Sequence, residues 1–521
     1  MSQVLFVSVT MKLLLISAVL LYVCESHKIL VVFPVPGKSH GILGAGVVKH
    51  LLNAGHEVST NKCAIQTTYA SKITSLPLFK IVLHLCLTLD LDDIDVWIMD
   101  LSDITVVQQI MHDISANTIR QDVVQKLIRD PSKTFDLVIA EWMFSELYSA
   151  LAPLYNCPLA WVSTVEPHWQ VMRLIDEPMN PAYSTNILGT HVPPYSFRYR
   201  IEELWAQLKG YISTSYNALE NAVYQEHIVP IMKQKGYAIP DYDVVIHNGS
   251  LMFGNSHVSM GLAPRLPQSY IPIGGYHIDT NIEPLKDDMK KLLDNAKNGL
   301  IYFSMGSNLK SKDIPDELKK GILQVFSELK QTVLWKFEEV LPNLPKNVHI
   351  VSWAPQPSIL AHPNSVLFIS HGGLLSTTEA IKFGKPMIGI PVFADQFANV
   401  ERAVHKGFAR KVDLSYHMVE DLRRELKEVL GNPKYTQNAK EWSIIYHDRP
   451  LTPDQELIFW VDHVVKTQGA LHLRSPALLL PWYQRLYLDL LAVVLVALGV
   501  LIYGLKEFFN SQVGKNKQKL S

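Results

Sequence analysis

The chain has 521 residues, of which 48% are hydrophobic, so it is too long for one ordinary domain and can fill at least two substantial cores. Its 48 Lys and Arg residues nearly balance its 49 Asp and Glu residues, and the formal net charge of -1 does not suggest a nucleic-acid partner. The cysteines, Cys24, Cys63, Cys86 and Cys157, form no C-x-x-C pair and show no metal-ligand spacing, which predicts neither a disulfide framework nor a zinc site.

The N-terminus has the pattern of a secretory signal peptide. Lys12 precedes an apolar run over residues 13–23, and Cys24 and Ser26 are placed for cleavage before His27. We therefore expect residues 1–26 to be removed. The alternative, an uncleaved N-terminal anchor, is disfavoured because the apolar run is short.

A β-α-β unit is predicted at the start of the mature chain. Residues 28–33 predict a strand, residues 34–41 a Pro/Gly loop, residues 42–53 a helix, and residues 56–58 the beginning of the next strand. His40 lies where the loop meets the helix, at the carboxyl end of the first strand, where open α/β sheets present groups to a ligand. A loop histidine in contact with water is the plainer alternative.

Two short patterns in the first half are not taken as sites. Gly44 and Gly46 fall inside the predicted helix without a third glycine at the right place, so they do not indicate a dinucleotide-binding oxidoreductase. Asp90-Leu91-Asp92 and Asp93-Ile94-Asp95 each match the D-x-D of metal-dependent transferases. Since both matches belong to one acidic run, a solvated charge cluster is the better interpretation, and no metal is expected.

The middle of the chain carries further candidates. Residues 135–144 predict a buried strand ending at Glu141, although a surface acid at a strand end has the same pattern. Residues 161–200 are rich in aromatic residues and proline, which suits a mobile lid over an apolar ligand or ordinary packing. Asn248 begins an N-glycosylation sequon, and residues 272–284 have the turn composition of a connection between two halves.

In the second half, small and polar residues again follow predicted strands. Residues 300–303 predict a strand, and the small-residue turn 304–307 follows it. Residues 348–351 predict another strand, followed by Trp353 and Gln356 in the sequence W-A-P-Q. An indole at this place can stack on a flat base, although core packing is the usual role of a lone tryptophan.

The next unit predicts a phosphate-binding turn. Residues 366–370 predict a strand buried in a parallel sheet, and His371, Gly372 and Gly373 form a turn after it. The S-x-x-E spacing of residues 376–379 is that of a capping box, which predicts a helix beginning at Ser376 and stopped by Gly384. Such a turn presents unpaired amides and the positive end of a helix dipole, where a diphosphate fits.

Another strand is predicted at residues 387–391, so polar residues collect at the ends of several parallel strands, where an α/β sheet binds ligands. These residues are Trp353, Gln356, His371, Ser376, Glu379, Asp395 and Gln396.

Near the C-terminus, residues 486–505 are apolar apart from Asp489 and are long enough to cross a bilayer, which needs ~20 residues. Lysines follow this run, which places the tail in the cytosol and residues 27–485 in the lumen as a type I protein. Lys517 and Lys519 in the final K-Q-K-L-S resemble the dilysine retrieval signal of endoplasmic reticulum membrane proteins. A solvated basic tail against anionic lipid is the alternative.

The W-x-P-Q, H-G-G, S-x-x-E and F-A-D-Q elements, in this order and spacing, closely resemble the UDP-glycosyltransferase family of membrane-bound animal UDP-glucosyl and UDP-glucuronosyl transferases. The resemblance covers most of residues 27–505 and is strongest over residues 300–400. It implies an α/β fold of the GT-B type, with two Rossmann-like domains facing a central cleft and one C-terminal transmembrane helix. The segments expected are residues 27–280 for acceptor binding, 281–450 for UDP-sugar binding, 451–485 as C-terminal helices and juxtamembrane segment, 486–505 in the membrane and 506–521 as cytosolic tail.

The resemblance also implies a role for each matched residue. P-G-K-S-H matches the catalytic histidine motif of the family, so His40 would be the general base, and Glu141 stands where the family commonly has an orienting Asp. The implied donor contacts are Trp353 with uracil, Gln356 with the base or ribose, His371, Gly373, Ser376 and Ser307 with the diphosphate, Glu379 with the ribose hydroxyls, and Asp395 and Gln396 with the sugar hydroxyls.

Two departures from the family pattern stand out. Leu375 occupies a place where many animal members have Asn, so one polar contact near the donor sugar is missing. Residues 59–100 lack the strand and Pro-rich loop of the family, which indicates either a diverged acceptor-side region or a mis-spliced segment.

The implied activity is inverting transfer of a hexose from a UDP-sugar to a hydroxyl of a small lipophilic acceptor, as in detoxification or in conjugation of pigments or hormones. Glucose is the favoured sugar and glucuronate the second choice. The UDP-sugar is a co-substrate, and neither a metal nor another cofactor is expected. The membrane is a partner through the C-terminal helix, and a homo- or hetero-oligomer is compatible with the sequence. The alternative is a non-catalytic, membrane-anchored UDP-sugar-binding subunit, which Glu141, Leu375 and the unusual segment favour and His40 opposes.

Overall fold

The computed structural model describes residues 26–35, 37–60, 104–184, 186–187, 189, 191–212, 215–306, 314–415 and 417–519. The expectations for the signal peptide, for the acidic run with its D-x-D matches and for Ser307 lie outside these residues. The helical backbone of the tail is described as far as Lys519, but its side chains are described only to residue 510.

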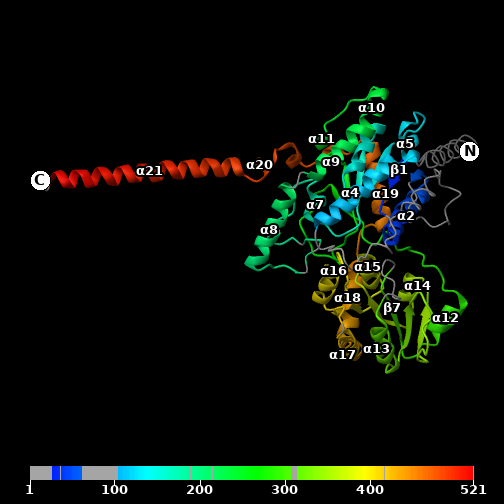
Figure 1. Cartoon of the computed structure of the whole chain (residues 1–521). Coiled ribbons are helices and arrows are strands. Elements are labelled where there is room, and N and C mark those ends of the chain that lie inside the picture. The colour runs from blue at the N-terminus through cyan, green and yellow to red at the C-terminus, as the bar shows by residue number, and fades with distance from the viewer. Residues whose placement is uncertain are drawn as a thin grey trace, which may run out of the picture.

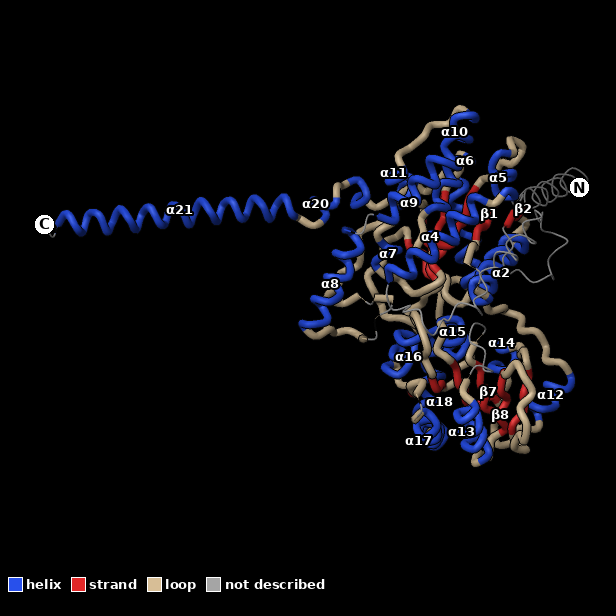
Figure 2. Tube along the Cα trace, in the orientation of Figure 1, coloured by secondary structure: helices blue, strands red, loops and turns tan. Residues whose placement is uncertain are grey.

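Two sheets organise the described part of the chain (Figures 1 and 2). The strands of the first sheet are β1 (Lys28–Val32), β2 (Glu57–Thr60), β3 (Leu137–Trp142), β4 (Leu159–Ser163), β5 (Leu251–Gly254) and β6 (Tyr270–Pro272). Those of the second are β7 (Leu300–Ser304), β8 (Thr332–Lys336), β9 (Val348–Val351), β10 (Ser365–Ser370), β11 (Met387–Gly389) and β12 (Ala409–Lys411). The spatial orders are β2-β1-β3-β4-β5-β6 and β12-β11-β10-β7-β8-β9. All of these strands pair in parallel, which confirms the predicted pair of Rossmann-like sheets.

Each sheet is buried on both faces. In β1, Ile29 and Val31 enter one core while Leu30 and Val32 enter the core on the opposite face, as the alternation of a strand requires. Residues 300–303 of β7 divide between two cores in the same way. Strands covered on both faces are continuous apolar runs, which is why β1 and β7 could be recognised in the sequence.

Helices supply both covering layers. Around the first sheet they are α2 (Lys38–Asn53), α4 (Ile104–Arg120), α5 (Asp122–Arg129), α6 (Leu151–Tyr155), α7 (Trp169–Met172), α8 (Phe197–Ile212), α9 (Ser215–Val223), α10 (Val229–Lys235) and α11 (Tyr242–Ile246). Around the second they are α12 (Asp287–Asp294), α13 (Asp316–Ser327), α14 (Gln356–Ala361), α15 (Leu374–Lys382), α16 (Gln396–His405), α17 (Met418–Gly431) and α18 (Lys434–His447). The chain ends with α19 (Pro453–Lys466), α20 (Trp482–Arg485) and α21 (Leu488–Lys519).

Helix α2 corrects one boundary predicted from the sequence. It begins at Lys38 rather than at Ile42, because the backbone N–H of Gly41 donates to the carbonyl of Gly37 at 3.0 Å and closes an earlier turn. His40 therefore lies in the first turn of the helix and not in a loop. Gly44 lies inside the helix as predicted, and a Cβ there would be 2.9 Å from the ring of Phe33, so its small size permits close packing on the strand end.

Helix α19 returns to the first domain after the chain has completed the second. Leu457, Val461 and Val464 are fully buried in the core on one face of the first sheet. The helix begins with a capping box formed by Thr452 and Gln455. The last helix of the globular body thus packs against the first elements of the mature chain.

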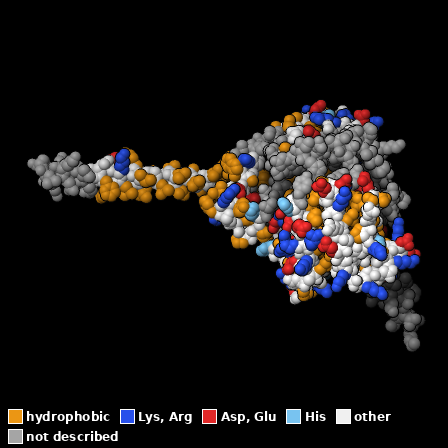
Figure 3. Space-filling view, turned by 60° about the horizontal axis from the view of Figure 1, so that its bottom comes forward, with side chains coloured by type: hydrophobic (Ala, Val, Ile, Leu, Met, Phe, Trp, Pro, Cys, Tyr) orange, Lys and Arg blue, Asp and Glu red, His pale blue; other side chains and the backbone are white. Residues whose placement is uncertain are grey.

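Helix α21 projects away from the body (Figure 1), and Figure 3 shows hydrophobic side chains along it. Its 23-residue stretch Leu488–Asn510 contains an 18-residue window that has a mean hydropathy of 2.5 and is unburied, and the stretch is long enough to cross a membrane. The helix begins at Leu488, two residues after the start of the apolar run predicted to span the membrane. Tyr487, with a φ of 56°, separates α20 from α21 at that point.

Candidate active site

A cavity of about 560 Å³ lies between the two sheets. It is lined by the first turn of α2, by the loops after β3 and β4, and by the loops and helix ends that follow strands of the second sheet. The crevice at the carboxyl ends of parallel strands is where α/β folds bind ligands, and the volume suits a small-molecule site. The sequence-predicted residues that it brings together are His40, Trp353, Gln356, His371, Gly373, Ser376, Glu379, Asp395 and Gln396.

His40 is held by a buried carboxylate. Its Nδ1 lies 2.5 Å from Oε1 of Glu141, whose side chain is completely buried at the end of β3. The side chain of His40 is 16% exposed and lines the cavity, so with Nδ1 engaged its Nε2 is the nitrogen available to a ligand. The proposed surface-acid alternative for Glu141 is wrong, because the residue is only 1% exposed.

The environment of His40 raises its pKa. Burial alone lowers the pKa of this imidazole, but the charge and hydrogen bond of Glu141 and the charge of Asp395 outweigh burial. Asp395 belongs to the second domain, so carboxylates from both domains act on the charge of His40. Burial raises the pKa of Asp395 itself, against the opposing hydrogen bond from Asn399.

The part of the cavity that the first domain lines is mostly apolar. Its side chains surround the approach to His40 from α2, α4 and the loops after β3 and β4. They are Ile42, Leu43, Val107, Met111, Met143, Phe144 and Val165, with Ile187 added from the segment between α7 and α8. Within residues 161–200, Trp161 and Trp169 are buried in the core, so packing is confirmed for these two aromatic residues.

His371 occupies a cradle made of two glycine turns. A Cβ on Gly306 would lie 2.5 Å from Cε1 of His371, and a Cβ on Gly373 would lie 2.5 Å from its Nε2. Only glycine at both places lets the imidazole lie against the turns after the neighbouring strands β7 and β10. Burial, reinforced by the charge of Lys336, lowers the pKa of His371 to about 4, so this histidine is a neutral hydrogen-bonding group at pH 7.

Lys336 is a cation of the cavity that the sequence did not single out. It lies at the end of β8, is 7% exposed, and its ammonium donates to the carbonyl of Gly306 at 3.0 Å and to Glu338 at 2.7 Å. It lines the cavity beside the turn after β7. No sequence motif marks it, and its importance follows from its burial in the structure, since lysine is rarely buried without a function or a partner.

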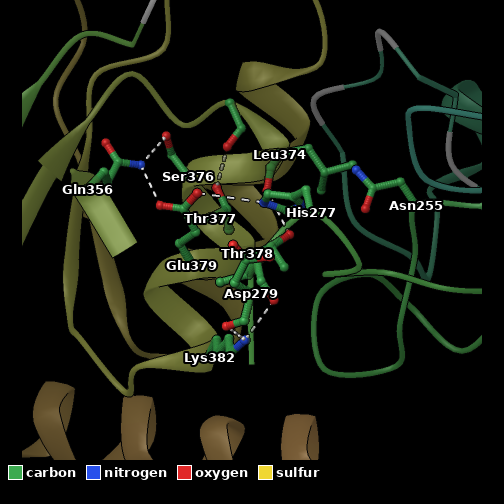
Figure 4. A network of polar contacts seen from close by, with 12 residues as sticks. Asn255, His277, Asp279, Gln356, Leu374, Ser376, Thr377, Thr378, Glu379 and Lys382 are labelled. Carbon is green, nitrogen blue, oxygen red and sulfur yellow. Dashed lines mark hydrogen bonds and ion pairs between the residues drawn. The ribbon is translucent and has the colours of Figure 1, made fainter. Parts of the chain in front are cut away.

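A network of polar contacts surrounds the start of α15 (Figure 4). The amide nitrogen of Gln356 donates to Oγ of Ser376 at 3.1 Å and to Oε2 of Glu379 at 2.8 Å. On the other side, Nε2 of His277 lies 3.6 Å from Oε1 of Glu379. Glu379 is thereby fixed between α14 and the segment that connects the two domains.

The predicted capping box at this helix is wrong. α15 begins at Leu374, with Gly373 as the residue before its first turn, and no side chain caps that turn. Ser376 is the third helical residue, and Glu379 bonds to Gln356 instead of reaching back to the helix start. Gln356, which lies on another helix, is thus the partner of Glu379 in place of the start of α15. Residues of the first turn line the cavity, and no side chain caps their amides.

Trp353 is not a core residue, contrary to the usual role of a lone tryptophan. It is 52% exposed and lines the cavity after β9. The ammonium groups of Lys38 and Lys336 lie 5.4 and 5.8 Å from the centroids of its rings, so the indole has cations on its faces from both domains.

Gln396 is the first residue of α16, and Asp395 immediately precedes it. The side-chain oxygen of Gln396 accepts the backbone N–H groups of Val392 and Phe393 at 2.9 and 3.2 Å, which fixes the loop after β11. Ala394 in this loop has a φ of 53°, a conformation that costs energy for any residue but glycine and that often occurs at functional sites.

The segment that connects the two domains also lines the cavity, a role that the turn composition of residues 272–284 did not suggest. His277, Asp279, Ile282 and Glu283 line the cavity, and His277 is paired with Glu379. Local patterns could not reveal this, because the partners are about a hundred residues apart. Leu375 lines the cavity too and also packs against the core of the first sheet, so it replaces a polar contact with an apolar contact between the domains.

Asn248 lies outside the cavity. The residue is exposed, and its Oδ1 accepts a hydrogen bond from Arg474 at 3.0 Å. The third residue of its sequon, Ser250, is 8% exposed.

Comparisons with known proteins agree with this geometry. A family model described as UDP-glucoronosyl and UDP-glucosyl transferase matches residues 28–519. The chain is 29% identical to UDP-glucosyltransferase 2 of Dactylopius coccus over 93% of each chain, and 35% identical to human UDP-glucuronosyltransferase 2B15 over 49% of each chain. Among solved structures, the glycosyltransferase VinC in complex with dTDP superimposes with a TM-score of 0.55 at 15% identity, covering 84% of this chain and 100% of its own. The structural neighbours are GT-B glycosyltransferases, which confirms the predicted fold.

Proposed function

Because the chain belongs to the UDP-glycosyltransferase family, we propose that it transfers a hexose from a UDP-sugar to a hydroxyl group of a small lipophilic acceptor, with inversion at the anomeric carbon. One observation carries the proposal: a single cavity is lined by His40 of one domain, which the buried Glu141 holds from behind, and by predicted donor-binding residues of the other domain. We propose glucose as the sugar, since the relative aligned over nearly its whole length is named a glucosyltransferase, and glucuronate as the second choice.

His40 is the proposed general base. Its Nε2 takes the proton of the acceptor hydroxyl while Nδ1 stays bonded to Glu141, which stabilises the imidazolium that forms. The acceptor oxygen bonds to the anomeric carbon on the face opposite the diphosphate, and the bond from that carbon to the UDP oxygen breaks with its electron pair going to UDP. The apolar wall beside His40 supports a lipophilic acceptor.

The second domain would receive the charge that develops on UDP. The uncapped amides of α15, Ser376, the neutral His371 and the cation Lys336 all border the cavity. Fixed donors and a cation of this kind can stabilise a leaving diphosphate, so we propose that the reaction requires no metal. Ser307 completes this set in the proposal.

The other proposed contacts to the UDP-sugar come from residues that line the same cavity. We propose that Trp353 stacks on uracil with Gln356 beside it, that Glu379 accepts the ribose hydroxyl groups, and that Asp395 and Gln396 bind the sugar hydroxyls. The orientation of Glu379 by Gln356 and His277 supports its role, because its carboxylate is already held at the cavity.

Replacing Trp353 by alanine should weaken UDP binding about tenfold or more. Stacking of a base on an aromatic side chain is worth ~1–3 kcal/mol in single-stranded nucleic acids. Isothermal titration of the detergent-solubilised protein with UDP measures the effect, and Trp205→Ala is the matched control, since that exposed tryptophan lies on α8 outside the cavity. An affinity equal to that of the parent would remove the indole from the site.

The activity itself is tested by UDP release. The full chain is incubated with UDP-glucose or UDP-glucuronate and a panel of phenols, alcohols and steroids. We expect acceptor-dependent UDP release with UDP-glucose. A protein that binds UDP but releases none with any acceptor would be the non-catalytic binding subunit instead.

We also propose that the protein is a type I membrane protein of the endoplasmic reticulum, with both domains in the lumen and α21 as its anchor. The exposed apolar surface of α21 and the exposed Asn248 support this placement. The retrieval signal would be the terminal pair Lys517 and Lys519. The proposed glycan on Asn248 then provides a reporter of location.

Replacing Lys517 and Lys519 by serine should let the protein leave the endoplasmic reticulum. In the parent, the glycan on Asn248 should remain sensitive to endoglycosidase H; in the variant, it should become resistant during passage through the Golgi. Asn248→Gln is the control and should show no glycosidase-dependent mobility shift. A variant that stays sensitive would show that the tail is not the retrieval signal.

A further inference from the structure

Three side chains outside the cavity meet where the first strands of the mature chain touch α19. His27 immediately precedes β1, His56 immediately precedes β2, and Asp462 lies on α19. The side chains of His27 and His56 are 9% and 1% exposed, and that of Asp462 is 27% exposed. The two imidazole rings are stacked, with centroids 5.2 Å apart.

The atoms that face one another in this cluster have no hydrogen-bond partner. Nε2 of His27, Nε2 of His56 and Oδ1 of Asp462 are all buried and unpaired. Each histidine Nε2 lies 3.5 Å from Oδ1 of Asp462, and all three atoms lie within 4.8 Å of one another. Leaving three buried polar atoms unpaired is costly, so their convergence calls for an explanation.

The distances suit a shared metal ion better than a direct hydrogen bond. A direct bond would bring a nitrogen to about 2.7–3.2 Å from the carboxylate oxygen. Ligand atoms about 2.0–2.2 Å from a tetrahedral zinc ion are instead about 3.3–3.6 Å from one another. The two separations of 3.5 Å fall in the second range.

We propose that His27, His56 and Asp462 bind a divalent transition-metal ion of the zinc type. Two imidazoles and a carboxylate are a ligand set that zinc accepts, and solvent can supply the fourth ligand through the partly exposed side of Asp462. The ammonium of Lys466 lies 3.8 Å from the other carboxylate oxygen, Oδ2, so Oδ1 is left for the metal. Nδ1 of His56 accepts a long hydrogen bond of 3.4 Å from the backbone nitrogen of His27, and this contact must open for Nδ1 to carry the ring proton while Nε2 binds the ion.

Such an ion would be structural. The cluster joins the starts of β1 and β2 to the helix that returns from the second domain, and α19 contributes Leu457, Val461 and Val464 to the same core. The site shares no residue with the cavity. Metal binding there would stabilise the folded chain without taking part in the transfer reaction.

The test measures bound metal and stability, independently of activity. The full chain, purified in detergent through a tag without histidine, is stripped with a chelator and dialysed against micromolar ZnCl2, and zinc is counted by mass spectrometry. We expect one zinc ion per chain and a rise in the thermal midpoint on adding zinc. Asp462→Asn, which keeps the shape of a partly exposed side chain, and His56→Gln should each lower zinc affinity at least tenfold and abolish the rise.

A second histidine pair provides the matched control. His472 is exposed, His463 is half-buried, and their Nε2 atoms lie 3.0 Å apart, so they are the competing place for adventitious zinc. His472→Gln should leave both the zinc count and the thermal shift unchanged. No bound zinc in the parent, zinc retained equally by Asp462→Asn, or zinc lost only in His472→Gln would overturn the proposal.

Discussion

The His40→Ala variant should transfer sugar at or below about a hundredth of the rate of the parent while binding UDP with unchanged affinity. General-base assistance typically supplies ~10²–10⁴ in rate, and alanine removes the only nitrogen that the pair with Glu141 presents to the cavity. UDP affinity should be kept because the proposed donor contacts come from the second domain. The measurements are kcat from UDP release and Kd from titration with UDP, on the same preparation.

A histidine of the same helix gives the control for this variant. His50 is ten residues further along α2 and its Nε2 contacts the carbonyl of Tyr276, outside the cavity. His50→Ala should keep the parent rate. A His40→Ala protein that retains more than about a tenth of the activity would show that another group takes the proton.

The second large effect concerns the carboxylate behind the base. In the parent, the rate should rise with pH as neutral His40 replaces imidazolium, and we call this rising part of the pH–rate profile the limb. Its midpoint should lie above the ordinary histidine pKa, because Glu141 and Asp395 raise the pKa of His40 despite burial. In Glu141→Gln the negative charge is lost. Burial, which lowers the pKa, then weighs more, so the limb should move to lower pH.

The size of the shift can be bounded. Hydrogen bonds to charged groups contribute about 1.5–3 kcal/mol, and one pKa unit corresponds to about 1.4 kcal/mol, so the limb should move by about one to two pH units. The maximum rate should fall by about tenfold to a hundredfold, because the imidazolium formed in the transition state loses the same stabilisation. In the Glu141→Gln variant, the maximum rate and the pKa of His40 should both fall. Partial unfolding of the variant would lower the rate but would leave the pKa unchanged.

Glu146→Gln is the matched control for the pH profile. Glu146 is a buried carboxylate in the loop after the same strand, but it pairs with Arg173 and does not line the cavity. Its variant should keep the position of the limb. A Glu141→Gln profile that coincides with the parent profile would remove Glu141 from the mechanism.

The parts of the fold that could be predicted from the sequence are those set by local pattern. β1, β7 and β10 are apolar runs because parallel strands are covered on both faces, and Trp353 and Glu379 follow strands at the edge where ligands bind. Such patterns place a residue at the cavity. They do not say which partner it has there.

The errors arose where a distant partner decided the outcome. Ser376 and Glu379 have the spacing of a capping box, yet Gln356 from α14 holds both side chains, and the helix begins earlier at Leu374. α2 also begins earlier than its composition suggested, since helix packing on the sheet outweighs the weak helical preference of the P-G-K-S-H segment. Local sequence preference predicts helix boundaries and caps poorly where tertiary contacts compete with it.

The residues that were missed belong to the same class. Lys336 is at the end of a strand that no motif marks, and His277 lies in the connection between the domains. Helix α19 looked like one of several C-terminal helices, although it fills the core of the first domain. Each becomes visible only when segments far apart in the chain are placed side by side.

The configuration of the product tests the central claim most directly. UDP-glucose carries its sugar in the α configuration, and attack by an acceptor oxygen activated by His40 on the face opposite the diphosphate gives a β-linked glucoside. Proton NMR of the product formed with a phenol that supports UDP release distinguishes the anomers by the coupling of the anomeric proton. We predict the β-linked product, and an α-linked glucoside would contradict the account.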